Sequence, residues 1–469
     1  MRGRNPRLGR RPGASSGRQW RRGGAMLIPL GLALLLVGAG VADPPPLIEA
    51  AKGGDWEAVG VLLEQGTDVT VTAADGATAL HWASYWDVVE TAQLLIRAGA
   101  DVSAANDLGA TPLWIASLNG STSMTRTLLE AGADPNAALL SGESPVMTAA
   151  RTGSPQVVER LLAAGADPNA SATRGQTALM WAASQLHSDV VGVLLEHGAD
   201  VQARSETWSQ VMAVSPHSHP ANQQDVLHGG NTALTFAARV GDLSSARMLV
   251  NAGADVNDAD ARGVSATVLA VHSGFGDLAE FLLDEGADPN ASEAGFSALH
   301  VAILRRDEHI ANRLLALGAD PNARLMNWTP SRRASADWSI SPALIGATPF
   351  WLAARLSQPG VMRLLLERGA DPFFVHEVRY VTAAGSYGAA GTEEKTTTLM
   401  AAVGMGGSRR IRAFVNPDPA ELEALTLEAV QLVVELGVDV SATDLQGRTA
   451  GDTRSYPSVR DFLAAESAR

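Results

Sequence analysis

Three histidines come closest, by residue type and spacing, to a chemically active site. His217, His219 and His228 fall within one short stretch, and imidazole nitrogen is a common ligand of zinc and related metals. The stretch offers no fixed geometry and no carboxylate until Asp225. We therefore predict that no metal binds here, and we keep a metal-binding or catalytic site as an alternative hypothesis.

Other reactive groups are missing or are spaced in a way that does not suit catalysis. The aspartate of a repeated Gly-Ala-Asp tripeptide has no partner carboxylates nearby, so it does not resemble a calcium loop. Cysteine is absent, which removes disulfides, thiolate metal sites and a cysteine nucleophile. No phosphate-binding loop, dinucleotide fingerprint, zinc helix or nucleophile elbow occurs. The sequence predicts a protein that is not an enzyme and uses no cofactor.

The glycines instead mark a repeat. Gly-Ala-Asp recurs with its glycine at 99, 132, 165, 198, 253, 286, 318 and 369, and degenerate copies stand at Gly66 and Gly437. Successive copies from Gly66 to Gly198 are 33 residues apart. Each unit has an opening Gly, a Thr or Ser that can cap a helix, an apolar helix, a turn, and a second helix ending in Leu-Leu. Such a unit cannot bury its apolar face alone, so it must stack on its neighbours.

The units resemble the ankyrin repeat, whose signature is Thr-Pro-Leu-His-x-Ala at a 33-residue period. The segments that carry the resemblance are Thr111–Ala116 (TPLWIA), Thr78–Ala83 (TALHWA) and Ser297–Ala302 (SALHVA). The similarity spans about residues 45–465. It implies an all-α repeat solenoid over 43–469, with about ten ankyrin repeats and a truncated C-terminal cap. For function it implies protein–protein recognition.

The first 42 residues have the composition of a targeting segment. They hold eight arginines and no acid, and an apolar core at Met26–Val37 precedes small residues ending at Ala42. This order is typical of a secretory signal peptide, so we predict cleavage after Ala42 and a periplasmic or secreted protein. The alternative is an uncleaved signal anchor.

The remaining chain is strongly acidic. It carries 28 basic and 50 acidic residues, a net charge near −22. A surface of that sign disfavours nucleic acid and anionic membranes as partners. We expect a monomer whose partner is an unidentified protein.

Three insertions interrupt the period between a Gly-Ala-Asp turn and the next opening Gly, at 204–229, 324–345 and 373–395. A fourth, at 406–420, separates the two helices of the tenth unit. Long loops on a rigid scaffold are frequent recognition sites, and Trp, Tyr and Arg are frequent interface anchors. Alternatively, these aromatic residues only hold the loops against the solenoid. The predicted partner-binding residues in the insertions are Trp208, Trp328, Arg332, Arg333, Trp338 and Tyr380.

The second candidate surface lies at the end of each first helix, which is exposed on the concave face of the ankyrin arrangement. Its predicted partner-binding residues are Tyr85, Trp86, Arg151, Arg239, Arg305 and Arg355. Alternatively, the arginines are ordinary solvated side chains. We expect Trp82, Trp181 and Phe236 to pack against neighbouring helices, and Trp114 and Trp351 to be half-buried packing residues. The leading hypothesis is an exported protein-binding module, and a further alternative is an effector secreted into a host cell.

Overall fold

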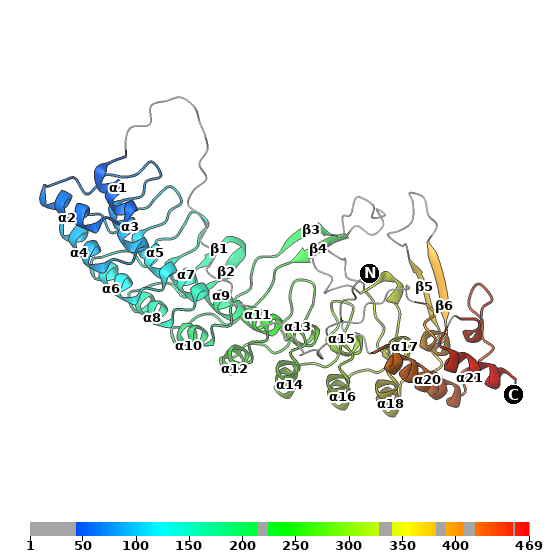
Figure 1. The fold of residues 1–469 in the computed structure, drawn as a ribbon. Helices are drawn as coiled ribbons and strands as arrows, with labels where there is room; N and C mark the ends of the chain where they lie inside the picture. The colour runs from blue at the N-terminus through cyan, green and yellow to red at the C-terminus, as the bar shows by residue number, and fades with distance from the viewer. Residues whose placement is uncertain are drawn as a thin grey trace, which may run out of the picture. The chain divides into compact units, whose positions relative to one another are not determined.

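A computed structural model describes residues 44–212, 224–327, 340–380, 391–406, 418–453 and 455–468. The predicted signal peptide, residues 1–42, lies outside them. The described residues form ten helix pairs and a C-terminal cap, as the sequence predicts (Figure 1). We call the first helix of each pair the inner helix. The inner helices are α1 (Pro46–Gly53), α3 (Ala79–Tyr85), α5 (Pro112–Asn119), α7 (Pro145–Thr152), α9 (Ala178–Ser184), α11 (Ala233–Val240), α13 (Ala266–Ser273), α15 (Ala298–Arg305), α17 (Pro349–Arg355) and α19 (Thr398–Ala402).

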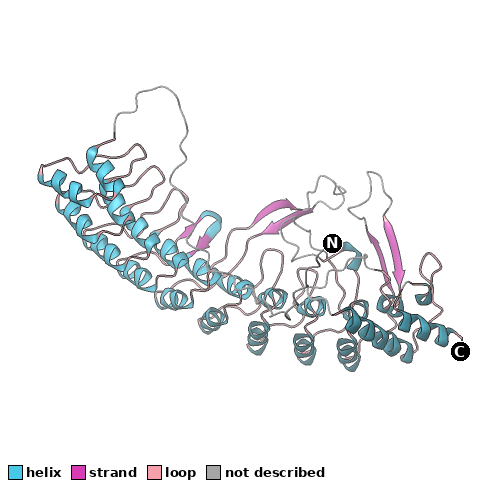
Figure 2. Ribbon diagram, in the orientation of Figure 1, coloured by secondary structure: helices cyan, strands magenta, loops and turns pink. Residues whose placement is uncertain are grey.

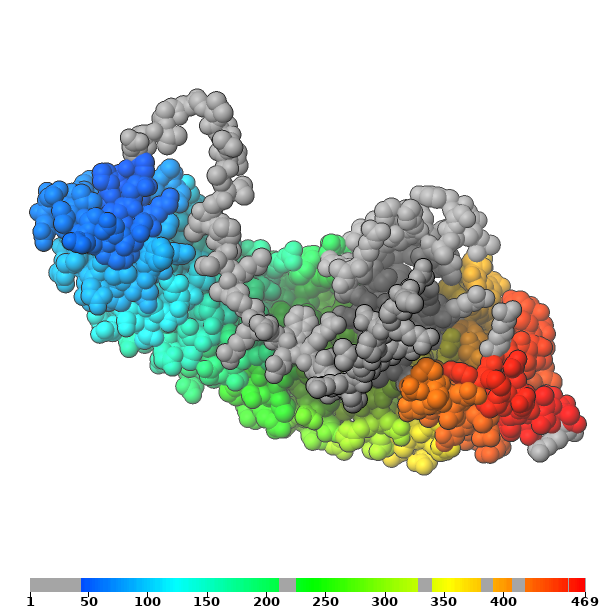
Figure 3. All heavy atoms as spheres, viewed as in Figure 1, coloured from blue at the N-terminus to red at the C-terminus, as the bar shows by residue number. Residues whose placement is uncertain are grey.

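The second helix of each pair, the outer helix, packs on its own inner helix and on the outer helices of the neighbouring repeats. The outer helices are α2 (Trp56–Glu64), α4 (Val89–Arg97), α6 (Thr122–Glu130), α8 (Pro155–Ala163), α10 (Ser188–Glu196), α12 (Leu243–Asn251), α14 (Gly276–Asp284), α16 (Glu308–Ala316), α18 (Pro359–Glu367) and α20 (Pro419–Glu435). In Figure 3 the colours of the described residues follow one another in chain order, as expected for a stack of sequential units.

Local sequence explains where the helices begin and end. At the start of α5, the Thr111 hydroxyl accepts a hydrogen bond from the Trp114 backbone N–H at 3.2 Å, and Pro112 takes the first-turn position, where no N–H is needed. After α6, Gly132 has φ of 92°. This left-handed conformation ends the helix and favours glycine.

A histidine in the first turn of some inner helices joins one repeat to the next. In α3 the Nδ1 atom of His81 accepts a hydrogen bond from the Thr78 backbone N–H at 3.0 Å. Its Nε2–H donates to the Ala110 carbonyl of the next hairpin at 2.9 Å. His81 is buried, so this pair of bonds fixes one neutral tautomer and the spacing of adjacent repeats.

An asparagine ladder connects the turns that follow the outer helices. The Asn136 amide donates to the Gly165 carbonyl at 2.9 Å, and its oxygen accepts from the Asp167 N–H at 2.8 Å. Equivalent pairs of bonds are made by Asn169, Asn290 and Asn322. The next position in the series is Phe373, whose side chain has no hydrogen-bonding group. The asparagine ladder therefore ends at the ninth repeat.

Three short antiparallel hairpins are added to the helices (Figure 2). The strands are β1 (Ser171–Ala172) with β2 (Gln176–Thr177), β3 (Trp208–Met212) with β4 (Gln224–His228), and β5 (His376–Tyr380) with β6 (Thr392–Thr396). The last two hairpins lie within the first and third insertions. The chain ends in a short 3-10 helix at Ala450–Asp452 and in α21 (Pro457–Ser467), which packs on α20.

The fourth insertion differs in extent from the expectation. Residues 406–420 were expected to lie wholly between two helices, but α20 already begins at Pro419. The Asp418 side chain accepts a hydrogen bond from the Ala420 N–H at 2.9 Å and starts the helix. No helix among the described residues is long and apolar enough to cross a membrane.

Candidate functional site

The described parts of the first insertion pair as two antiparallel strands. Trp208 lies opposite His228 in the register of β3 and β4, and their rings stack with centroids 5.5 Å apart. The guanidinium of Arg174, from the preceding hairpin, lies 4.3 Å from the centroid of the Trp208 ring. Trp208 is half-buried. Its known contacts are thus within the chain, as the packing alternative describes, and its role in binding stays a prediction.

The base of this hairpin is fixed by an ion pair between a buried carboxylate and a partly exposed arginine. The Arg204 guanidinium bonds the carboxylate of Asp258, which is only 2% exposed. Arg204 also donates to the carbonyls of Gly230 at 3.1 Å and Ala259 at 2.9 Å. Burial raises the pKa of Asp258, and Arg204 opposes that rise. One arginine therefore joins the insertion to the next repeat on its C-terminal side.

The base of the third insertion is held by an aromatic contact. The buried His376 ring lies on Trp351 with centroids 4.4 Å apart, and its Nε2 bonds the Ile345 carbonyl at 2.9 Å. Burial lowers the pKa of His376. Trp351 is fully buried, so the expectation that it would be half-buried is wrong. The physical reason is that a residue 25 positions later in the chain covers it.

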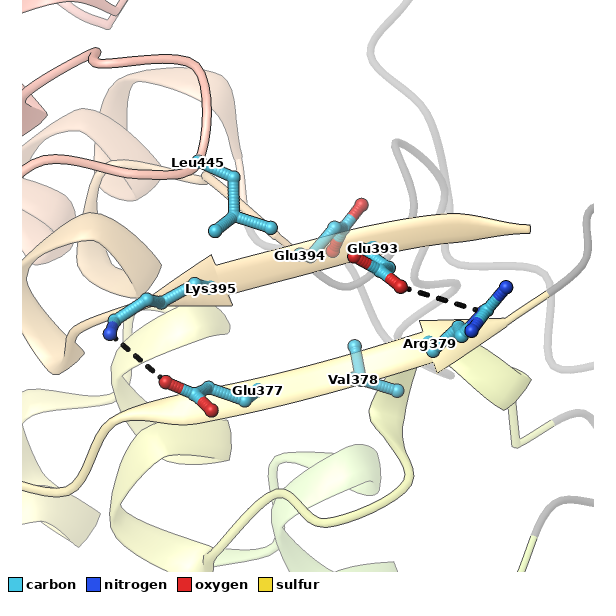
Figure 4. A pocket seen from close by; sticks show the side chains of 7 residues that line it. All are labelled: Glu377, Val378, Arg379, Glu393, Glu394, Lys395 and Leu445. Carbon is cyan, nitrogen blue, oxygen red and sulfur yellow. Dashed lines mark ion pairs between the residues drawn. The ribbon is translucent and has the colours of Figure 1, made fainter. Parts of the chain in front are cut away.

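The two faces of the β5–β6 hairpin differ. On one face the Tyr380 hydroxyl donates to the Glu394 carboxylate at 2.6 Å, and burial raises the pKa of this tyrosine, which is only 9% exposed. Tyr380 was predicted to contact a partner, but its ring is already covered by the chain. The other face carries two cross-strand ion pairs, Lys395–Glu377 at 3.0 Å and Arg379–Glu393 at 3.5 Å, and these residues line a shallow pocket together with Leu445 (Figure 4).

The second insertion is described only at its two ends. Leu325 is buried and pairs with the next repeat through two backbone hydrogen bonds, its N–H to the Ala347 carbonyl at 3.0 Å and its carbonyl from the Gly346 N–H at 2.6 Å. Met326 is 67% exposed. The predicted binding residues Trp328, Arg332, Arg333 and Trp338 lie outside the described residues.

The aromatic pair on the inner helices is exposed as predicted. Trp86 is 50% and Tyr85 39% exposed, and their rings meet edge to face with centroids 5.4 Å apart. Trp82, Trp181 and Phe236 are partly buried against the core, which agrees with their expected packing role. The structure thus places Trp82, Trp181 and Phe236 partly in the stack and leaves Tyr85 and Trp86 more exposed.

The four predicted arginines do not form a row of free cations. Each donates to a group of this chain, and burial lowers the pKa of Arg239, Arg305 and Arg355. The bonds are those of Arg151 to Glu143 at 2.8 Å, Arg239 to Asn231 at 3.1 Å, Arg305 to the His272 carbonyl, and Arg355 to the Gly406 carbonyl at 2.9 Å. A role in holding the stack explains these contacts directly.

Two further apolar residues of the candidate surfaces are exposed. Leu118, at the end of α5, is 37% exposed, and Phe373 is 58% exposed where the asparagine ladder ends. Among the residues that the structure describes, no three His, Asp or Glu side chains come together as metal ligands would. His217 and His219 lie outside those residues.

Comparison with known proteins agrees with this architecture. Family models described as ankyrin repeats (3 copies) match residues 47–138, 135–205, 211–293 and 234–325, and a model of the single ankyrin repeat matches 345–376. An ankyrin repeat-containing protein of Treponema pallidum (strain Nichols) is 32% identical over 135 residues, which span 28% of this chain and 39% of that protein.

Among solved structures, the human ASB11 ankyrin repeat domain is 28% identical with a TM-score of 0.43, covering 52% of this chain and 98% of that domain. The family models together cover more than half of the chain. The chain therefore belongs to the ankyrin repeat family.

Proposed function

We propose that the chain is an exported module that binds another protein through its inserted hairpins and its inner helices. Ankyrin repeats are in general protein–protein interaction modules. The observation that carries the proposal is the way the insertions are built. Ordering a loop costs about 1–2 kcal/mol per residue in backbone entropy, and here that cost is offset by strand pairing and by buried contacts at the base. A preordered hairpin on a rigid stack binds with little further loss of entropy.

Exposed apolar side chains on these elements are available to a partner. Leu227 on β4 is 47% exposed, and Phe373, beside β5, is 58% exposed. Trp86 adds an exposed aromatic ring on the inner helices. Large apolar and aromatic groups of this kind anchor protein interfaces when a partner removes them from water. The acidic net charge argues against a nucleic acid partner.

Site-specific photocrosslinking tests the location of the interface. A photoreactive residue placed at Leu227, Phe373 or Trp86 should form adducts with a partner protein in the native cell. The same residue at Leu94, which is 44% exposed on the outer helix α4, is the matched control. Equal adducts at all four positions, or adducts at Leu94 alone, would mean that the proposed surfaces are wrong.

Export is a separate part of the proposal and has its own test. It is supported by the arginine-rich, acid-free start of the chain and the apolar segment Met26–Val37. Expressed in a bacterium, the chain should lose residues 1–42 and leave the cytoplasm. N-terminal sequencing that found an intact start on a soluble cytoplasmic product would refute export while leaving the binding proposal standing.

A further inference from the structure

The side chains of α3 and α5 that are not buried are large and apolar, apart from one asparagine. In α3 every side chain is buried except those of Trp82 and Tyr85, and Trp86 follows directly as the C-cap. In α5 the side chains that are not buried are Trp114, Ile115, Leu118 and Asn119. We name as the apolar stripe the residues Trp82, Tyr85, Trp86, Trp114, Ile115 and Leu118.

Contacts between the two helices hold the apolar stripe together. The Asn119 amide donates to the backbone carbonyls of Ser84 and Tyr85, each at 3.0 Å, which fixes the end of α5 against the end of α3. The Tyr85 ring meets Trp82 edge to face at 5.8 Å and Trp86 at 5.4 Å between centroids. The exposed rings are therefore fixed in place before any partner arrives.

The apolar stripe has clear ends along the stack. On the N-terminal side, α1 exposes the charged residues Glu49 and Lys52. On the C-terminal side, the corresponding positions of α7 are Arg151 and Thr152, both polar. A partner that buries the stripe is thus confined to the second and third repeats.

Three aromatic rings of the inner helices, including Trp82 within the apolar stripe, have a cation of the chain nearby. Lys52 lies 6.0 Å from the centroid of Trp82, Arg151 lies 5.9 Å from that of Trp181, and Arg239 lies 5.9 Å from that of Phe236. Within the described part of the chain, no cation lies over Tyr85, Trp86 or Trp114. These three rings still offer a negative face to a cation from outside.

The charge around the apolar stripe favours the same kind of partner. Residues 44–142 contain twelve acidic residues and only three bases, Lys52, Arg97 and Arg126, and none of the twelve belongs to an ion pair of the described structure. Such a region attracts cationic segments and repels acidic ones.

We propose that the apolar stripe binds a protein segment in which arginine or lysine alternates with apolar side chains. The apolar groups cover Leu118 and Ile115, and the cations lie over Trp86 and Tyr85. This inference rests on the proposed binding function and adds the chemistry of the partner. The proposed occupant of the apolar stripe is a cationic peptide segment, and the inserted hairpins make separate contacts with a partner.

The test uses the full chain and two synthetic peptides, one alternating Arg with Leu and a matched one with Glu in place of every Arg. The Arg peptide should change the tryptophan fluorescence saturably and bind more weakly as salt is raised. Trp86→Ala should weaken its binding roughly tenfold, as expected for a tryptophan at the centre of an interface. Trp86→Phe should keep most of the affinity, and the exposed outer-helix control Leu94→Ala should keep all of it.

Three outcomes would overturn the inference. If the Glu peptide binds equally well and also depends on Trp86, the stripe is a protein-binding site of a different chemistry, and the proposed function survives. If the Arg peptide binds the parent chain and Trp86→Ala with equal affinity, the acidic surface attracts the peptide without the apolar stripe. If neither peptide binds and sedimentation shows self-association that Trp86→Ala abolishes, the occupant is a second copy of the chain.

Discussion

Replacing His300 should change how the stability of the repeat stack depends on pH. The ring lies in the first turn of α15 and is 1% exposed. Its Nδ1 accepts hydrogen bonds from the Ser297 backbone N–H at 3.3 Å and hydroxyl at 3.0 Å, while Nε2–H donates to the Ala323 carbonyl at 3.2 Å. Protonation would add a buried charge and remove an acceptor, and burial accordingly lowers the pKa of His300 to about 4.

The sign and size of the effect follow from linkage. In the unfolded chain the histidine pKa returns to 6.5. Between pH 6.5 and about 4, His300 is therefore protonated in the unfolded state and neutral in the folded state. The stability that depends on neutral His300 is therefore fully present above pH 6.5 and is lost as the pH falls toward 4. The loss attributable to this residue is about 2 kcal/mol between pH 7.5 and pH 5, and about 3 kcal/mol below both pKa values.

Urea unfolding followed by circular dichroism, repeated across that pH range, measures the effect. His300→Gln keeps hydrogen-bonding groups but does not titrate there, so its stability should fall by about 2 kcal/mol less than that of the parent chain between pH 7.5 and pH 5. His309→Gln, at a side chain that is 77% exposed on α16, is the matched control for the substitution itself. Parallel curves for the parent and His300→Gln would refute the reasoning.

Three further predictions concern the stack itself. Leu249→Ala, in α12, should lower the free energy of unfolding by about 2–5 kcal/mol because the side chain is fully buried. The control is Leu317→Ala, at a side chain that is 39% exposed, and an equal loss in both variants would contradict the buried position of Leu249. Asn290→Ala should cost about 1 kcal/mol, since it removes one member of the asparagine ladder, and calorimetry can measure it. Arg204→Met should lower the free energy of unfolding by about 2 kcal/mol and speed hydrogen exchange at the base of β3–β4, because Asp258 loses its partner. This loss should be smaller when Asp258→Asn is already present, and additive losses would show that the two residues are not coupled.

The repeating fold was predictable because its determinants are local. A capping Thr111 and a Pro112 act within the first turn of one helix, a left-handed Gly132 ends the next, and the sequence repeats a Thr or Ser cap and the glycine in most units. The strands of the insertions also leave a pattern in the sequence, although a weak one. His376–Tyr380 and Thr392–Thr396 alternate in burial along the hairpin, but in such short segments a period of two residues is a weak signal.

Contacts between distant residues set the limit of prediction. The burial of Trp351 depends on His376, and the pairing of Arg204 with Asp258 joins residues 54 positions apart. The arginines of the inner helices show the same limit, since their spacing indicates a common surface but not the carbonyl or carboxylate that each one bonds. The sequence shows Tyr85 and Trp86 as a bulky aromatic pair, but it does not show that Asn119 bonds the backbone beside them.

The asparagine ladder bears on how such a gene can change over time. Each asparagine bonds only to the backbone of the turn that follows it, so the bond does not depend on which side chains that next repeat carries. Any two units that keep this turn and its asparagine can be joined, and duplication or recombination among the units that carry Asn136, Asn169, Asn290 or Asn322 preserves such a joint. Beyond Phe373 that freedom ends, because the tenth unit is matched to its neighbour by side chains such as Ser357 and Thr426, whose hydroxyls bond at 2.8 Å. New repeats are therefore expected to enter this lineage in the middle of the array and not at its C-terminal end.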